Sequence, residues 1–233
     1  MTAVAPWPPP AVPALEEGDV QVWSLDLDAE PDASLLDAGE RERAGRFVSD
    51  ELTRRWTNAR AGLRGVLAAY CGADATQLRI ESAPCVHCAE PHGKPFLAEP
   101  SGHDLRFNLS HSGTVGLVAV ARGREVGVDV EAIRPGRRAD GIASRWFTPE
   151  ESDHLRGLGE AEAELAFYRL WARKEAYLKA TAAGVPGGLD SFDALHLELA
   201  SGAEPGWEFA DLDVGAGYAA ALAVAPPGYR PGG

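Results

Sequence analysis

Cysteine is scarce in this sequence, which has three among 233 residues: Cys71, Cys85 and Cys88. Three is too few, and an odd number, for a disulfide framework, so the composition indicates a reducing compartment. No apolar run approaches the roughly 18 residues that cross a bilayer. The first residues also lack the basic start and apolar stretch of a secretion signal. We therefore expect a cytoplasmic protein without a membrane partner.

Positive charge is also in short supply, because 22 Lys and Arg residues stand against 35 Asp and Glu residues, a formal net charge of −13. An acidic surface repels a nucleic-acid backbone, so we expect no nucleic-acid partner. The apolar fraction of 45% and the charged fraction of 24% are those of a globular protein. The length suits one large domain or two halves of about 100 residues each.

Two helix-like segments repeat one another. The first begins at Trp56 and reads WTNARAGLR, and the second begins at Trp171 and reads WARKEAYLK. In both, Ala, Leu and a basic residue follow the Trp at the same positions. Apolar residues recur with helical spacing along the first segment, and Ser49 or Asp50 can cap it. The repeat predicts one helix used twice. Chance similarity between two amphipathic helices is the alternative.

Strand-like runs flank each helix in the same order. VQVWSLDL from Val20 and EVGVDVE from Glu125 precede the helices, and GLVAVA from Gly116 and ALAVA from Ala221 follow them. This pattern predicts an α+β fold made of two similar α+β halves related by a pseudo-twofold axis.

The repeat also sets the expected boundaries. The two halves cover residues 15–122 and 123–225, and their interface is the expected active site because ligands prefer clefts between domains. Residues 1–14, rich in Pro and Ala, and the tail 226–233 are expected to be flexible.

Two carboxylates share one face of the second strand-like run. Asp129 and Glu131 are one residue apart, and strand side chains alternate between faces. Val126, Val128 and Val130 then point the other way, into the core. Paired negative charges are costly unless a cation binds, and oxygen ligands suit a hard ion such as Mg²⁺. A solvated strand face is the alternative for an isolated pair.

A further carboxylate lies on the second repeated helix. Glu175 and Lys179 are four residues apart and share a helix face. Alone they form an ordinary ion pair of a few tenths of a kcal/mol. Together with Asp129 and Glu131 they supply a third metal ligand and a cation for a phosphate group.

Two turns offer groups for binding an anion. RFNLSHSG, from Arg106 to Gly113, ends in small hydrogen-bonding residues that can present backbone N–H groups to a phosphate. GKPF, residues 93–96, is a turn with a basic side chain. A lone histidine in such a turn is more often structural, so neither motif is specific by itself.

CVHC, from Cys85 to Cys88, is a single Cys-x-x-Cys motif and therefore half of a zinc site, with His87 and His92 as conceivable partners. The second ligand pair of a structural zinc site is missing. The sequence therefore favours a turn over a metal centre, and both cysteines are predicted to be dispensable.

As a set, five phrases resemble the Sfp-type 4′-phosphopantetheinyl transferases. GKPF, FNLSHSG, VGVDVE, FTPEE and WARKEAYLK occur in that family's order and at about its spacing, within residues 41–199. The resemblance implies a Mg²⁺-dependent transfer of 4′-phosphopantetheine from coenzyme A to a serine of an apo-carrier protein (acyl, peptidyl or polyketide). Adenosine 3′,5′-bisphosphate would leave. We expect the enzyme to be a monomer.

The resemblance also implies catalytic roles. Asp129, Glu131 and Glu175 would hold Mg²⁺, and Lys179 would neutralise the diphosphate and the leaving group. Glu151, in FTPEE, would act as the base for the incoming serine or help to orient it. Which glutamate takes the proton is left open.

A second implied set would bind coenzyme A. Glu40 departs from the family here, because it stands where a well-known bacterial member has a lysine, so the hold on the 3′-phosphate is in question. The implied residues are Arg43, Arg55, Ser110, His111 and Lys179 for the phosphates, and Gly93, Lys94 and Pro95 for the adenine.

Two other functions fit the same residues. A magnesium-dependent nucleotide pyrophosphatase would use these carboxylates with water as the nucleophile, and product analysis with and without a carrier separates the two. A degenerate repeat kept as an acidic interaction module is the non-enzymatic alternative. The presence of every acidic ligand argues against that module.

Basic residues cluster in the loop RPGRRADG, residues 134–141. Carrier proteins are acidic, so an enzyme of net charge −13 needs a basic patch to dock one. Arg134, Arg137 and Arg138 are the predicted patch. A solvated loop whose arginines pair with the enzyme's own acids is the alternative.

Overall fold

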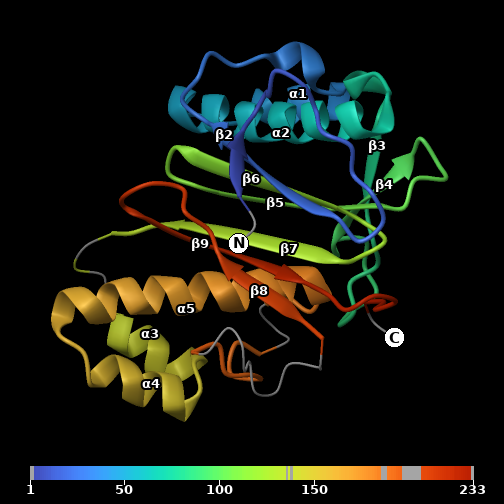
Figure 1. The fold of residues 1–233 in the computed structure, drawn as a ribbon. Coiled ribbons are helices and arrows are strands. Elements are labelled where there is room, and N and C mark those ends of the chain that lie inside the picture. The colour runs from blue at the N-terminus through green and yellow to red at the C-terminus, as the bar shows by residue number, and fades with distance from the viewer. Residues whose placement is uncertain (1–2, 135, 137–138, 185–187, 196–205, 232–233) are drawn as a thin grey trace.

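The computed structural model describes residues 3–134, 136, 139–184, 188–195 and 206–231. Its elements lie in layers: helices, a first sheet, a second sheet and a long helix (Figure 1). Two shorter helices pack on the outer side of that long helix. The helices are α1 (Ala38–Ala44), α2 (Asp50–Cys71), α3 (Ala139–Trp146), α4 (Pro149–Arg156) and α5 (Glu160–Thr181), with the 3₁₀ turns η1 (Ala33–Leu35) and η2 (Ala75–Gln77).

The first sheet has the strand order β1-β2-β6-β5. In this sheet β6 is antiparallel to both of its neighbours, β2 and β5, and α2 covers one face (Figure 1). Ser49 caps α2 by accepting a hydrogen bond from the N–H of Leu52, as predicted, and Gly72 ends it with a positive φ of 62°. The strands are β1 (Val4–Pro6), β2 (Val20–Asp26), β5 (Leu105–Ser112) and β6 (Val115–Arg122).

The second sheet has the order β7-β9-β8, also antiparallel. Each half therefore contains a strand, a long helix and a later hairpin whose second strand pairs with the first strand. This agreement is consistent with the predicted pseudo-twofold relation. The strands are β7 (Val126–Ala132), β8 (Glu208–Asp211) and β9 (Tyr218–Val224), and a separate hairpin is formed by β3 (Arg79–Ser82) and β4 (Pro95–Glu99).

The first residues differ from the prediction of a flexible segment. β1 pairs in parallel with β2, and the rings of Trp7 and Trp23 meet edge to face at 5.3 Å. The prediction is wrong for this stretch, because an apolar segment can satisfy the open edge of β2 and bury an indole there. At the other end, residues 225–231 contain no helix or strand, but the ring of Tyr229 packs on Trp207 at 5.1 Å.

The two sheets pack face to face through aliphatic side chains. Val126, Val128 and Val130 of β7 are buried there, as their alternation with the carboxylates predicts. Leu117 of β6 and Leu222 of β9 belong to the same cluster. Among the described residues, no helix combines the length and apolar character that crossing a membrane requires.

Side chains of β5 bond the edge of β7. The backbone N–H groups of Val128, Val130 and Ala132 point away from β9, and they donate to Asn108 Oδ1 at 3.0 Å, Ser110 Oγ at 3.3 Å and Ser112 Oγ at 3.0 Å, respectively. An edge strand exposes donors that cost free energy if they are buried without partners. These three side chains, which we call the β5 ladder, satisfy them and fix the register of one half against the other.

Small residues bring α5 close to the second sheet. A Cβ atom at Gly127 of β7 would lie 2.0 Å from the carbonyl oxygen of Ala176 and 2.6 Å from the backbone nitrogen of Ala180, both on α5. Only glycine permits this approach. Glu175 and Lys179 immediately precede the two contacted residues, so the close packing brings them to the carboxylate face of β7.

Candidate active site

A cluster of polar and charged side chains, which we call the charged group, forms where β7, α5 and β5 meet. Lys179 Nζ donates to Asp129 Oδ1 at 2.5 Å and to Ser110 Oγ at 3.0 Å, and Ser110 Oγ donates to the same carboxylate oxygen at 2.8 Å. The structure thus brings together Asp129, Lys179 and Ser110 from three elements. Sequence analysis had placed Ser110 with the phosphates, and its buried hydroxyl instead supports the carboxylate.

Asp129 has one oxygen that its neighbours leave unsatisfied. The residue is 3% exposed, and Oδ2 is buried without a hydrogen-bond partner. A buried carboxylate oxygen without a partner is costly, and a cation relieves that cost. This atom is therefore the direct structural indication that the group can hold a metal ion.

Glu175 is held close to other negative charges. Burial raises the pKa of its carboxyl, the charges of Asp129 and Glu131 raise it further, and Lys179 opposes them. Ser112 Oγ lies 3.4 Å from Glu131 Oε2, which places this second carboxylate at the end of the β5 ladder. Asp129, Glu131 and Glu175 offer only oxygen donors, the kind of ligand that a hard divalent cation prefers. Among the described residues, however, their oxygens do not all lie within 4.8 Å of one another.

A hollow of about 120 Å³ adjoins Glu131. Its other walls are Ile142, Phe167, Tyr168 and Trp171, all of them apolar or aromatic. One side of the carboxylate group is therefore polar and the other apolar, an arrangement that suits a ligand with a charged end and an uncharged chain.

A larger pocket of about 550 Å³ lies on the first half, beside the group. Arg43, Arg60 and His111 line it, together with the Trp56 ring, over which the Arg43 guanidinium lies at 5.6 Å. Loss of surrounding water and the charge of Lys179 lower the pKa of His111. The two guanidinium groups can bind an anion, and we call this pocket the anion pocket, although the carboxylates of Asp37, Glu40 and Glu81 also line it. Sequence reasoning missed Arg60, although it lies four residues after Trp56 on the same helix face.

Glu40, the residue that departs from the family's pattern at this pocket, is already paired. Glu40 accepts a hydrogen bond from Arg60 Nε at 2.8 Å and another from the buried guanidinium of Arg64. Arg64 also pairs with Asp37. Glu40 therefore neutralises the buried Arg64 and the half-buried Arg60, and its charge does not stand alone in the pocket.

The turn GKPF divides between two environments. Pro95 lines the anion pocket, and a Cβ atom at Gly93 would lie 2.7 Å from the Ala83 carbonyl oxygen, which explains the glycine. Lys94 turns away and donates to Glu125 Oε2 at 2.6 Å and to the Val126 carbonyl at 2.9 Å. Burial lowers the pKa of Lys94, and Glu125 opposes this shift. Its side chain joins the two halves.

Arg55 is not among the described residues that line the anion pocket. Its guanidinium pairs with Asp28 at 2.8 Å and with Glu51. The Asp28 hydrogen bond raises the pKa of Arg55. The structure thus brings Arg43, but not Arg55, to the pocket predicted for both.

Glu151 is fully buried and has a full set of partners. Its carboxylate accepts hydrogen bonds from the N–H groups of Thr148 at 3.0 Å and Ala194 at 2.7 Å, and it pairs with Lys174 Nζ at 2.8 Å. None of these partners also contacts Asp129, whose own hydrogen bonds are with Ser110 and Lys179. Thr-x-x-Glu is a capping-box pattern, so the sequence did contain the signal for this structural role. A catalytic role for Glu151 stays a prediction.

The predicted docking loop is described only in part. The N–H of Arg134 donates to the Tyr168 hydroxyl at 3.1 Å, and that of Gly136 donates to Glu164 Oε1 at 2.9 Å. Arg137 and Arg138 lie outside the described residues.

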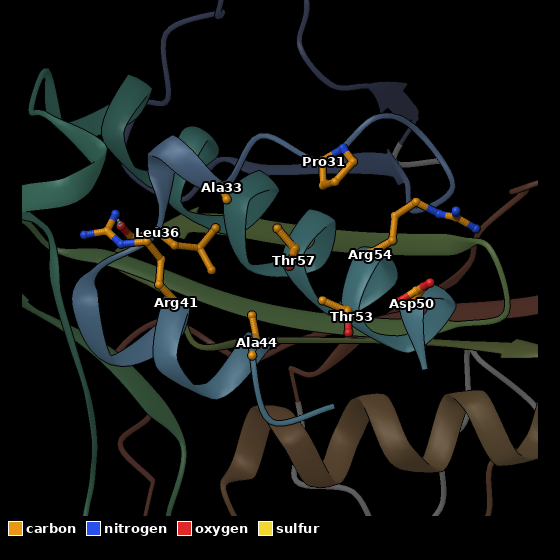
Figure 2. A pocket seen from close by; sticks show the side chains of 10 residues that line it. Pro31, Ala33, Leu36, Arg41, Ala44, Asp50, Thr53, Arg54 and Thr57 are labelled. Carbon is orange, nitrogen blue, oxygen red and sulfur yellow. Dashed lines mark hydrogen bonds between the residues drawn. The ribbon is translucent and has the colours of Figure 1, made fainter. Parts of the chain in front are cut away.

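Figure 2 shows another pocket, of about 410 Å³, between η1, α1 and the start of α2. Leu36, Ala44 and Thr57 are among its walls, and Arg41 and Arg54 extend toward its sides. None of the predicted site residues lines it. The anion pocket beside the carboxylates is therefore the one relevant to the predicted chemistry.

The family model and the relatives that match this chain all describe the same kind of enzyme. A family model described as the 4′-phosphopantetheinyl transferase superfamily matches residues 125–223. The 4′-phosphopantetheinyl transferase HetI of Nostoc sp. (strain PCC 7120 / SAG 25.82 / UTEX 2576) is 34% identical over 236 residues, covering 96% of this chain and 94% of HetI. The 4′-phosphopantetheinyl transferase Sfp of Bacillus subtilis (strain 168) is 28% identical over 203 residues, covering 84% and 85% of the two chains. The 4′-phosphopantetheinyl transferase psf-1 of Bacillus pumilus is 43% identical over 108 residues, covering 45% and 43%.

Proposed function

Because this chain belongs to the 4′-phosphopantetheinyl transferase superfamily, we propose that it moves the phosphopantetheine arm of coenzyme A to a serine hydroxyl of an apo-carrier protein. The chain is a transferase of this group, as its relatives are. Coenzyme A as donor, Mg²⁺ as cofactor and a carrier serine as acceptor are the proposed part. The observation that carries the proposal is the unsatisfied Asp129 Oδ2 beside two glutamates at the junction of the halves.

Mg²⁺ is the proposed cofactor, with Asp129, Glu131 and Glu175 as its protein ligands. It retains several waters in most sites and needs few carboxylates when a substrate supplies phosphate oxygens. When bound, it would act as a Lewis acid on the diphosphate of coenzyme A.

Lys179 is suited to hold the diphosphate. Its three N–H donors are directed at Asp129, Ser110 and the Val128 carbonyl, and the last of these bonds is the longest at 3.4 Å. A phosphate oxygen can replace that carbonyl without breaking the two shorter bonds. The ammonium would then neutralise charge on the leaving group, which is the main assistance that phosphoryl transfer needs.

The base that takes the serine proton is proposed to be Glu131 or Glu175. Both oxygens of Glu151 are already engaged by Thr148, Lys174 and Ala194, and the carboxylate is fully buried, so it is poorly placed to meet an incoming serine. Glu131 lies between the charged group and the apolar hollow, where an incoming serine would approach. A general base must reach the proton it removes.

The anion pocket is proposed to bind the 3′-phosphate end of coenzyme A. Arg43, Arg60 and His111 would contact phosphate, and Trp56 and Pro95 would pack on the adenine. The chain has both halves of this site, which supports a monomer as the active unit. The scarcity of cysteine supports a cytoplasmic location.

Intact-mass measurement of apo-carrier proteins tests the proposal. Incubation with coenzyme A and Mg²⁺ should add one phosphopantetheine to each carrier and release adenosine 3′,5′-bisphosphate, and a chelator should prevent both. Cleavage of coenzyme A at the same rate without a carrier would instead indicate a pyrophosphatase. A chain that does neither with any acyl, peptidyl or polyketide carrier would overturn the function.

A further inference from the structure

A group of metal-ligating side chains lies in the loop between β3 and β4, away from the carboxylates. Cys85, Cys88 and His92 each offer one ligand atom, and these atoms all lie within 4.8 Å of one another. Cys88 Sγ and His92 Nε2 are 3.1 Å apart. Within the described ranges it is the one group of three such side chains drawn together this closely.

The spacing of these atoms suits zinc. Zn–S bonds of about 2.3 Å and Zn–N bonds of about 2.0 Å in a tetrahedron place ligand atoms roughly 3.5 Å from one another. The group therefore needs only a small contraction around an ion. Two thiolates and an imidazole are soft ligands that select zinc over magnesium, so this site and the carboxylate group differ in the ion they prefer.

The backbone of the loop is folded back on itself. Cys85 N–H donates to the Glu90 carbonyl, and Ala89 N–H donates to the Cys85 carbonyl, both at 2.8 Å. Ala89 has a positive φ of 63°, a left-handed conformation that is unfavourable for a residue with a side chain. The left-handed residue directly follows Cys88 and turns the chain so that His92 returns to the two cysteines. Such strain persists where a local constraint requires it.

We propose that Cys85, Cys88 and His92 bind one Zn²⁺ ion, with a water molecule as the fourth ligand. His87 is not assigned as the fourth ligand, because it does not belong to the group of ligand atoms and its Nε2 is bonded at 2.6 Å to the carbonyl oxygen of Ala183, just after α5. The cysteine pair that the sequence offered as half a site thus gains a third protein ligand from the fold.

The ion would brace the hairpin that forms one wall of the anion pocket. Ser82 at the end of β3 and Pro95 at the start of β4 line that pocket, and the loop that carries the three ligands joins them. Ala83 N–H already donates to the Lys94 carbonyl at 3.0 Å across the base of the loop. Zinc would close the loop above this bond and dock it through His87 on the second half.

Zinc content of the full chain tests the site directly. Protein made without a histidine tag and purified under reducing conditions should contain one zinc ion per chain by elemental analysis. Cys88→Ser and His92→Gln should each lose most of it. Cys71→Ser, which changes a cysteine of α2, and His87→Gln, which changes the histidine assigned to docking, should keep it.

Cobalt substitution covers the case in which a variant fails to fold. The wild-type chain, stripped of zinc and titrated with Co²⁺, should develop the sulfur-to-cobalt charge-transfer absorption of a thiolate site, and its melting temperature should rise with added zinc. Zinc retained equally by Cys88→Ser and Cys71→Ser, or a cobalt complex without that absorption, would overturn the proposal. A Cys85–Cys88 disulfide in the native chain would also overturn it. Transferase activity enters none of these readouts, so the outcome is independent of the proposed function.

Discussion

Lys179 Nζ lies 2.5 Å from Asp129 Oδ1, while Oδ2 of the same carboxylate is buried without a partner. One carboxylate is thus half neutralised by a fixed ammonium and half available. The ammonium comes from α5 and the carboxylate from β7, so the pairing depends on the close packing of the two elements at Gly127.

Asp129→Asn is expected to abolish transfer while the fold persists. The amide keeps the shape of the side chain but removes the charge that a cation needs, so kcat/KM should fall by more than about 100-fold. Thermal stability should change little, because the amide relieves the repulsion between Asp129 and Glu175 but also removes the ion pair with the partly exposed Lys179. Single-turnover mass spectrometry at limiting Mg²⁺ measures the rate. Asp153→Asn on the exposed side of α4 is the control, and wild-type rates in Asp129→Asn would disprove the metal assignment.

Glu151→Ala is expected to lower the stability of the fold and to leave the chemistry of the folded fraction unchanged. Breaking a fully buried ion pair leaves Lys174 without its partner, and the free energy of unfolding should fall by about 3–5 kcal/mol. The fraction that remains folded should keep the wild-type pH profile of kcat. Denaturant unfolding measures the loss, and Glu150→Ala, its exposed neighbour, should show little change. If Glu151→Gln were as stable as the wild type yet lost the acidic limb of the profile, where a base becomes deprotonated, Glu151 would be the base after all.

Glu175 is expected to make the metal-free protein less stable as pH rises. Its pKa in the folded chain lies above the ordinary value of 4.5. The native state therefore holds the proton more tightly than the unfolded state, and stability falls as pH rises from 4.5 through the raised value. Glu175→Gln should flatten this part of the curve of melting temperature against pH in chelator, whereas Glu160→Gln on the exposed start of α5 should not. Parallel curves for the wild type and Glu175→Gln would contradict the shift.

Arg43→Ala is expected to weaken coenzyme A binding, and Arg55→Ala is not. A lost charge-assisted hydrogen bond is worth about 1.5–3 kcal/mol, which corresponds to roughly a tenfold to hundredfold rise in KM. The wild type should lose a similar factor with 3′-dephospho-coenzyme A, and Arg43→Ala should lose little more with that substrate. An equal rise in KM for Arg55→Ala would mean that the ion pair with Asp28 opens when substrate binds.

Arg137→Glu with Arg138→Glu is expected to raise the KM for the carrier and to leave the KM for coenzyme A unchanged. The effect should grow as ionic strength falls, because exposed charges are screened by salt. Arg46→Glu with Arg230→Glu makes the same charge change at exposed positions elsewhere. An equal effect in both double variants would mean that overall net charge, and not this loop, sets the carrier KM. An unchanged carrier KM at low salt would mean that the loop is solvated and does not bind the carrier.

Sequence periodicity predicted the short-range geometry of the site. The alternation of β7 separates buried valines from Asp129 and Glu131, and the four-residue spacing of α5 places Glu175 and Lys179 on one face; both relations depend only on the local backbone. Longer-range features could not be predicted in this way. The partners of Lys94 and Arg55 depend on which elements meet in space. The β5 ladder requires knowing which two strand edges face each other, and the return of His92 to the cysteines depends on a left-handed residue at Ala89.

Gly127 has no side chain to offer a substrate, yet the spacing of the site depends on it. Any larger residue would press on the Ala176 carbonyl and force α5 outward. Glu175 and Lys179 would move with the helix, while Asp129 and Glu131 stayed on the strand. A chain altered in this way would retain every charged residue of the site and still lack a working centre. A check of those charged residues alone would then count an inactive descendant as an enzyme, and the residue at position 127 is where to look for the difference.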